Sequence, residues 1–184
     1  MASFICRKCG KGLRSLTEIF KSGDNVFCDT CFHAPNFRPD FGNQADFEKA
    51  VELIKKPATL ETKIILLVDD DVHIRKLYVE EFNEVFGDKV KTIAFRDGIS
   101  AFDFLKEYLD NVHLIISNIA MPGIDGIKFL KMCKKLTPNI PFIVHTAYEN
   151  IKDSIPEANA YIIKGASLSE LLDVVRKFLD IYDN

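Results

Sequence analysis

Five consecutive aliphatic residues, Ile64 to Val68, run directly into three carboxylates, Asp69, Asp70 and Asp71. A short run that is apolar at every position is typical of a strand buried on both faces of a parallel sheet. The three aspartates then lie at the carboxyl end of that strand, where open α/β sheets place their sites. Crowded carboxylates need a cationic partner nearby, unless they only cap the helix that follows.

Strand patterns of this kind alternate with helical patterns from residue 63 to the end of the sequence. Such alternation predicts an α/β fold with a five-stranded, parallel, doubly wound sheet that is covered by helices on both faces. The expected strands are 64–68, 90–95, 112–117, 140–146 and 161–163. The expected helices are 72–86, 98–109, 124–136 and 168–182, with a short segment reaching Pro156 before the last strand.

Polar side chains end three further predicted strands: Asn118, Thr146 and Lys164. Because the carboxyl ends of parallel strands meet at one edge of the sheet, we expect these residues to face Asp69 and Asp70. The lysine ammonium would then be the cation that the paired carboxylates require.

This set of residues, in this order, resembles the receiver domain of two-component response regulators. The resemblance covers residues 63–182 and a flavodoxin-like fold is implied. It is carried by four motifs: Leu67-Val68-Asp69-Asp70, Met121-Pro122-Gly123-Ile124-Asp125-Gly126, Thr146-Ala147 and Tyr161-Ile162-Ile163-Lys164.

The family implies phosphoryl transfer from a histidine kinase to an aspartate at the end of the third strand. Asp69 and Asp70 would bind Mg²⁺, helped by that aspartate and by the backbone carbonyl of Ala120. Thr146 and Lys164 would contact the phosphoryl oxygens, and Tyr161 matches the aromatic residue that packs inward when the switch threonine moves.

The phospho-acceptor position holds Asn118, four residues before Pro122. A carboxamide is a poor nucleophile and cannot form the acyl phosphate. With one negative charge of three lost, the affinity for Mg²⁺ should fall, and Lys164 must pair with Asp69 or Asp70. Two explanations stay open: a natural pseudo-receiver, or an ordinary receiver that carries an Asp→Asn substitution.

Two further departures from the family pattern favour the pseudo-receiver. Gly165 follows the lysine where receivers usually have proline, so the last loop should be freer. The stretch from Thr146 to Lys164 is about one helical turn shorter than is usual, so the fourth helix should be short or irregular.

The remaining polar residues near the predicted site have simpler interpretations. Asp71 and Asp125 are expected to start helices rather than to bind metal. His73 and His145 are expected to make local hydrogen bonds, and Cys133 should be a packed thiol.

The N-terminal residues 1–34 contain two C-x-x-C pairs, Cys6 with Cys9 and Cys28 with Cys31, separated by 18 residues. Four thiolates at this spacing are typical of structural zinc, which would supply the folding free energy of a module with little core. The module resembles a zinc ribbon or the treble-clef half of a LIM-type finger. His33 is expected not to be a ligand.

Between this small zinc-binding module and the receiver-like domain at 63–184, residues 35–62 read as a linker containing an amphipathic helix at 45–56. The apolar face of that helix could dock on the next domain, or serve a partner or a second copy in a homodimer.

Composition bounds the class of protein. A net charge of -3 argues against general nucleic-acid binding, and the strand-length apolar runs predict no membrane span. No signal peptide is apparent, so we expect a cytoplasmic protein.

The sequence therefore predicts a two-component-type signalling protein that is not an enzyme and binds protein partners, a histidine kinase or other signalling proteins, without being phosphorylated. The alternative is a conventional phospho-accepting regulator substituted at position 118. A third hypothesis is a regulator whose zinc module contacts DNA. It depends on the mildly basic first 34 residues, which contain five basic and three acidic residues.

Overall fold

The computed structural model describes residues 62–149, 151, 154–165 and 168–181, together with the backbone of four short N-terminal strands. Those strands form two antiparallel pairs, β1 (Phe4–Ile5) with β2 (Gly12–Leu13) and β3 (Phe20–Ser22) with β4 (Asn25–Phe27). The four paired cysteines and the linker helix predicted at 45–56 lie outside the described residues. The zinc module and that helix therefore stay predictions.

The main domain is built on a five-stranded parallel sheet in the order β6-β5-β7-β8-β9. The central strand β5 is the aliphatic run that ends in the aspartates, and all of its residues from Ile64 to Val68 are buried. The strands are β5 (Lys63–Val68), β6 (Val90–Phe95), β7 (Leu114–Ser117), β8 (Phe142–Thr146) and β9 (Ala160–Ile163). The predicted parallel, doubly wound sheet is confirmed.

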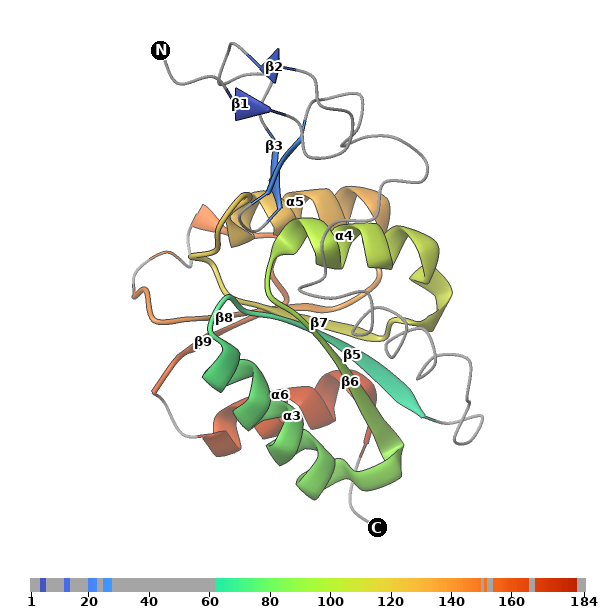
Figure 1. The fold of residues 1–184 in the computed structure, drawn as a ribbon. Coiled ribbons are helices and arrows are strands. Elements are labelled where there is room, and N and C mark those ends of the chain that lie inside the picture. The colour runs from blue at the N-terminus through green and yellow to red at the C-terminus, as the bar shows by residue number, and fades with distance from the viewer. Residues whose placement is uncertain are drawn as a thin grey trace.

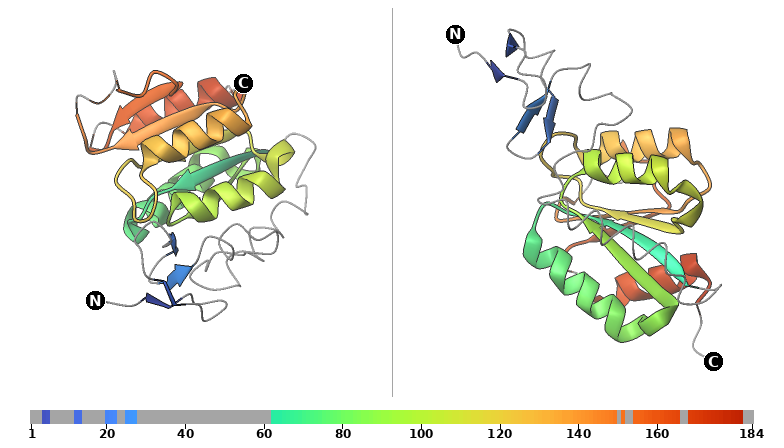
Figure 2. Two further views of the ribbon diagram at one scale, coloured as in Figure 1. Left: turned by 90° about the horizontal axis from the view of Figure 1, so that it is seen from above. Right: turned by 45° about the vertical axis from the view of Figure 1, so that its right-hand side comes forward.

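Among the residues that the structure describes, four α-helices cover the two faces of this sheet. The helices are α3 (Val72–Phe86), α4 (Gly98–Glu107), α5 (Gly126–Leu136) and α6 (Leu168–Leu179), with short 3-10 turns η2 (Gly87–Lys89) and η3 (Leu109–Asn111). Helices α4 and α5 lie on one face, and α3 and α6 lie on the other (Figure 1), as the two turned views also show (Figure 2).

The alternation of side chains along β5 divides the core into two clusters. Ile64, Leu66 and Val68 pack towards α4 and α5, while Ile65 and Leu67 pack towards α3 and α6. Because successive residues of a strand point to opposite faces, a run that is apolar throughout can supply both clusters.

Aspartates start three of the helices. Asp71 accepts from the backbone N–H of His73, Asp97 from that of Ser100, and Asp125 from that of Lys128. Each side chain satisfies a backbone donor that the first helical turn leaves unpaired. The interpretation of Asp71 and Asp125 as helix starts is confirmed.

Several predicted boundaries were wrong by a few residues. The cap at Asp125 delays the start of α5 to Gly126, and the proline at 141, which has no N–H to donate, precedes a strand that begins at Phe142. Helix α4 ends at Glu107, β7 begins at Leu114, and α6 ends at Leu179.

The connection between β8 and β9 contains no α-helix among its described residues, 147–149, 151 and 154–159. Single backbone hydrogen bonds shape it instead: the N–H of Ser154 donates to Ile151, and that of Ala158 donates to Ile155. The expectation of a short or irregular fourth helix is confirmed for these residues.

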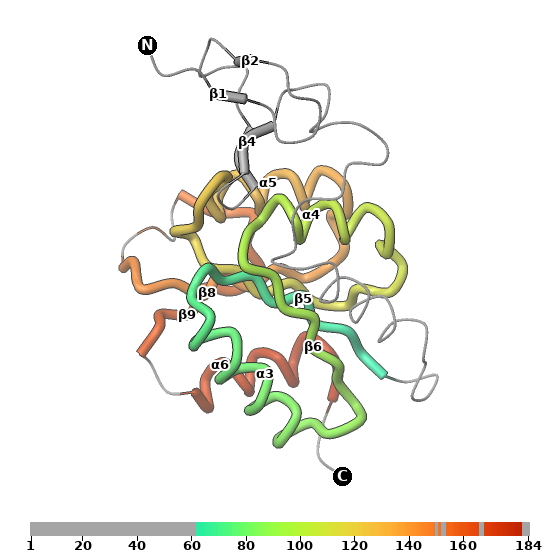
Figure 3. The backbone as a smooth tube through the Cα atoms, viewed as in Figure 1, coloured from blue at the N-terminus to red at the C-terminus, as the bar shows by residue number. Residues whose placement is uncertain are grey.

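The backbone trace shows the ends of β5, β8 and β9 gathered on one side of the sheet, at the left of the view (Figure 3). Parallel α/β sheets place their sites at this carboxyl edge.

In the part of the chain that the structure describes, no helix has the length and hydrophobicity needed to cross a bilayer.

Candidate functional site

The predicted ion pair lies at the carboxyl edge of the sheet. The ammonium Nζ of Lys164, directly after β9, is 2.5 Å from Oδ2 of Asp69, directly after β5. Asp69 is only 1% exposed, so its carboxylate depends on this cation. The prediction that Lys164 pairs with one of the two aspartates is confirmed, and the partner is Asp69.

Burial raises the pKa of Asp69 above its ordinary value of 3.8, while the hydrogen bond and charge of Lys164 oppose the rise. The backbone N–H of Asp71 also donates to Oδ1 of Asp69 at 3.0 Å. The second carboxylate, Asp70, is exposed. Of the two neighbouring aspartates, Asp69 is thus a buried carboxylate and Asp70 is a carboxylate that faces solvent.

Asn118 lies between the two loops that form the site. Its Nδ2 donates to Oδ1 of Asp70 at 3.0 Å and to the backbone carbonyl of Ala120 at 2.8 Å. Its Oδ1 accepts from the backbone N–H of Ile119 at 2.8 Å. The structure therefore brings the predicted positions Asp70, Asn118 and Ala120 together through the side chain of Asn118.

The two residues predicted as a switch both contact the backbone of Tyr148. Thr146 is fully buried, and its Oγ1 accepts from the N–H of Tyr148 at 3.3 Å. The hydroxyl of Tyr161 donates to the carbonyl of the same residue. Both switch positions are thus occupied by bonds to the loop after β8.

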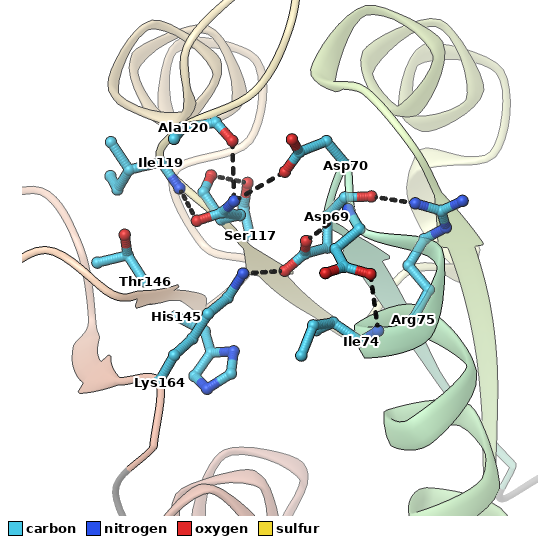
Figure 4. Close-up of polar contacts among 12 residues, drawn as sticks. Asp69, Asp70, Ile74, Arg75, Ser117, Ile119, Ala120, His145, Thr146 and Lys164 are labelled. Atoms are coloured by element: carbon cyan, nitrogen blue, oxygen red, sulfur yellow. Dashed lines mark hydrogen bonds and ion pairs between the residues drawn. The ribbon is translucent and has the colours of Figure 1, made fainter.

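Arg75 is a site residue that the sequence analysis missed. Its Nη1 donates to the backbone carbonyl of Asp69 at 2.5 Å, reaching back from α3 (Figure 4). Burial lowers the pKa of Arg75, and the charges of Asp69 and Asp70 act in the opposite direction. Its spacing from Asp71 could have predicted this contact. Asp71 caps α3, so Arg75, four residues later, lies one helical turn on, above the end of β5.

His145 also has a partner that was not predicted. Its Nε2 is 3.2 Å from the hydroxyl of Tyr78, and the two rings are in an edge-to-face arrangement. Burial, helped by Lys164, lowers the pKa of His145 to about 4, so the ring is neutral at physiological pH. The expectation of a local hydrogen bond for His145 is confirmed, as is that of a packed thiol for Cys133.

The fold and this edge define a doubly wound α/β domain with a cluster of acidic and polar side chains at the strand ends. The sequence model of the response regulator receiver domain matches residues 65–176. Sporulation initiation phosphotransferase F of Bacillus subtilis is 32% identical over 125 residues, covering 65% of this chain and 96% of that protein. The chain belongs to the response regulator receiver family, so its class is two-component signalling.

Solved structures agree with this assignment. Response regulator TrrA of Thermotoga maritima in complex with Mg²⁺–BeF has 32% identity and a TM-score of 0.57, covering 64% of this chain and 99% of that chain. The CheX–CheY–BeF₃–Mg²⁺ complex of Borrelia burgdorferi contains a chain with 26% identity and a TM-score of 0.57, covering 62% and 87%. Both of these solved complexes thus contain Mg²⁺.

Proposed function

We propose that the chain is a two-component-type signalling protein that acts as a protein–protein interaction module without accepting a phosphoryl group and without catalysing a reaction. The observation that carries this proposal is Asn118, whose carboxamide occupies the phospho-acceptor position and makes three hydrogen bonds within the protein. A neutral amide has neither the charge nor the nucleophilicity to attack a phosphoryl donor.

The conformation of the switch residues supports the same proposal. Thr146 and Tyr161 are both bonded to the backbone of Tyr148, so the loop after β8 is held by groups of the protein itself. A loop fixed in this way can present one surface to a partner without a phosphorylation event. The absence of a helix from the described residues between β8 and β9 gives that surface a shape of its own.

Gly165 bears on whether the departures are native. Its φ of 91° lies in the left-handed region, which proline cannot adopt because its ring fixes φ near −65°. The backbone after Lys164 is therefore built for glycine rather than for the usual proline. This favours a natural pseudo-receiver over an ordinary receiver with one substitution, although the preserved Asp69, Asp70 and Lys164 favour the latter.

Incubation with acetyl phosphate and Mg²⁺ separates these two alternatives. We expect no phosphoryl adduct on the unmodified chain in an intact-mass measurement, because the carboxamide of Asn118 cannot act as the nucleophile. The variant Asn118→Asp restores a carboxylate at the end of β7, and Asn139→Asp is the control, since Asn139 is exposed in the turn before β8. An adduct on Asn118→Asp alone favours a substituted receiver or a very recent loss of the phospho-acceptor. No adduct on the unmodified chain or on Asn118→Asp favours a pocket that has diverged as a whole.

An adduct on the unmodified chain would contradict the proposed function. In that case the phosphorylated residue is to be located by peptide mapping. If it is one of the aspartates or Thr146, the chain is a phospho-accepting protein despite Asn118.

The proposed partners are a histidine kinase or another signalling protein, met in the cytoplasm. A relative, CheY of Borrelia burgdorferi, is seen in complex with CheX, which is a precedent for a receiver and a signalling protein forming a stable assembly. DNA binding by the N-terminal module is the weakest candidate, because that segment is only mildly basic, with five basic and three acidic residues in the first 34.

The N-terminal module is proposed to hold a structural zinc ion on Cys6, Cys9, Cys28 and Cys31. We expect about one zinc per chain by elemental analysis. The variant Cys28→Ser should lose the metal while the receiver unfolds at an unchanged temperature. Cys133→Ala is the matched control, because Cys133 lies buried in α5 and should leave the zinc content unchanged. Iron in place of zinc, or equal metal content in both variants, would contradict the assignment.

A further inference from the structure

The side-chain amide of Asn118 connects the loop after β5 to the loop after β7. Its nitrogen lies 3.0 Å from the Asp70 carboxylate and 2.8 Å from the Ala120 carbonyl, and both of these oxygens can only accept. Its oxygen faces the N–H of Ile119, which can only donate. The chemistry of the three partners therefore fixes which end of the amide is nitrogen.

This arrangement does not fit a divalent cation. Mg²⁺ requires oxygen ligands at about 2.0–2.1 Å in near-octahedral geometry. Asp70 and Ala120 supply two of the oxygens that the family would use, but both are turned onto the NH₂ group of Asn118. In the described part of the chain, no group of three or more His, Cys, Asp or Glu side chains is placed to hold a metal.

Turning the amide over to offer its oxygen to a cation is also costly. The flip places the NH₂ group against the N–H of Ile119 and breaks three hydrogen bonds at once. Asn118 is only 7% exposed, so water would not readily replace the lost bonds. The side chain is therefore held in the orientation that repels a cation.

Charge balance leads to the same conclusion. Asp69 is paired with Lys164, and Arg75 lies close enough to interact with both Asp69 and Asp70. Asp69 thus already has a cationic partner, and the neutral amide of Asn118 adds no negative charge. A carboxylate at position 118 would add one negative charge beside Asp70, and carboxylate charge is what attracts a divalent cation.

We infer that the carboxamide of Asn118 takes the structural place of the divalent cation, joining Asp70 to Ala120 by hydrogen bonds, so that this pocket is assembled without Mg²⁺ and does not respond to it. The inference rests on the proposed function, because it explains how a receiver that is not phosphorylated keeps its strand-end loops together. Further bonds hold the same loop: Ser117 Oγ donates to the Asn118 carbonyl, and the N–H of Gly126 donates to that of Ile119.

The test is a titration of the full, ¹⁵N-labelled chain with MgCl₂ at constant ionic strength, followed by amide correlation spectra. The side-chain NH₂ signals of Asn118 are identified by their loss in Asn118→Asp. In the unmodified chain we expect these signals to exchange slowly with solvent and to keep their positions, as should the backbone signals of Asp70 and Ala120. Asn118→Asp should bind Mg²⁺ at least about tenfold more tightly.

Asn139→Asp adds the same charge at an exposed turn before β8, at the opposite edge of the sheet, and should behave like the unmodified chain. Saturating shifts at Asp70 and Ala120 of the unmodified chain, with the affinity of Asn118→Asp, would overturn the inference. So would Asn118→Asp failing to bind Mg²⁺, because the amide would then not be what excludes the cation. Either result leaves the proposed function intact if the mass measurement shows no adduct.

Discussion

Replacing Lys164 with methionine is expected to lower the free energy of unfolding by about 3–5 kcal/mol at neutral pH, the cost typical of removing one partner of a buried ion pair. The side chain of Asp69 is 2% exposed and that of Lys164 is 17% exposed, with 2.5 Å between the charged atoms. Methionine keeps the apolar stem but leaves the carboxylate buried without its nearest cation. Urea unfolding of both proteins measures the difference.

The loss should depend on pH in a defined direction. Burial already raises the pKa of Asp69 from 3.8, and Lys164 opposes that rise. Without the ammonium the pKa rises further, so the folded state holds the proton more tightly than the unfolded state does. The stability of Lys164→Met therefore falls as the pH rises from 3.8 through the folded pKa, and its deficit is largest at neutral pH.

The double variant Asp69→Asn, Lys164→Met is the control for this prediction. It removes both charges and keeps a side-chain oxygen for the N–H of Asp71, which now donates at 3.0 Å. Removing both partners together should recover most of the lost stability and abolish the pH dependence. Equal unfolding of Lys164→Met and the unmodified protein at every pH would show that the pair does not stabilise the fold.

The sheet could be predicted because its signal is local. Each strand is a short apolar run. The run from Ile64 to Val68 is predicted to be a central strand because both of its faces are apolar. The aspartate caps were equally visible, since the residue before a helical pattern determines where the helix begins. Boundaries were less certain because the competition between a strand and its neighbouring turn is decided by single hydrogen bonds.

The residues brought to the strand ends could be predicted from topology, but their bonds could not. The order of the strands places Asp69, Asn118 and Lys164 at one edge, yet the sequence does not say which aspartate meets the lysine. It also does not say which way the carboxamide turns. The contacts of Arg75 and of the Tyr78–His145 pair were also missed. Each of them joins a side chain of helix α3 to a residue at the end of a strand, and the sequence alone does not show which helix residues face a strand end.

Gly126→Ala is expected to destabilise the receiver by about 3 kcal/mol or more, because the added methyl group has no space. A Cβ at Gly126 would lie 2.1 Å from the carbonyl oxygen of Asn118 and 2.7 Å from the Cα of Ile119. Both are backbone atoms, which cannot rotate away as a side chain can. The N–H of Gly126 also donates to the Ile119 carbonyl at 2.7 Å, so the start of α5 and the loop after β7 are held in direct contact.

The matched control for this variant is Gly98→Ala. Gly98 is likewise the first residue of a helix that an aspartate caps, but the three atoms nearest its Cβ would be side-chain atoms of Ile124 and Phe129, at 3.1–3.2 Å. Those side chains can adjust, so Gly98→Ala should cost clearly less. Thermal and urea unfolding of the pair separates the steric effect from any general effect of alanine at a helix start. Equal losses would contradict the close approach of Gly126 to the backbone of Asn118 and Ile119.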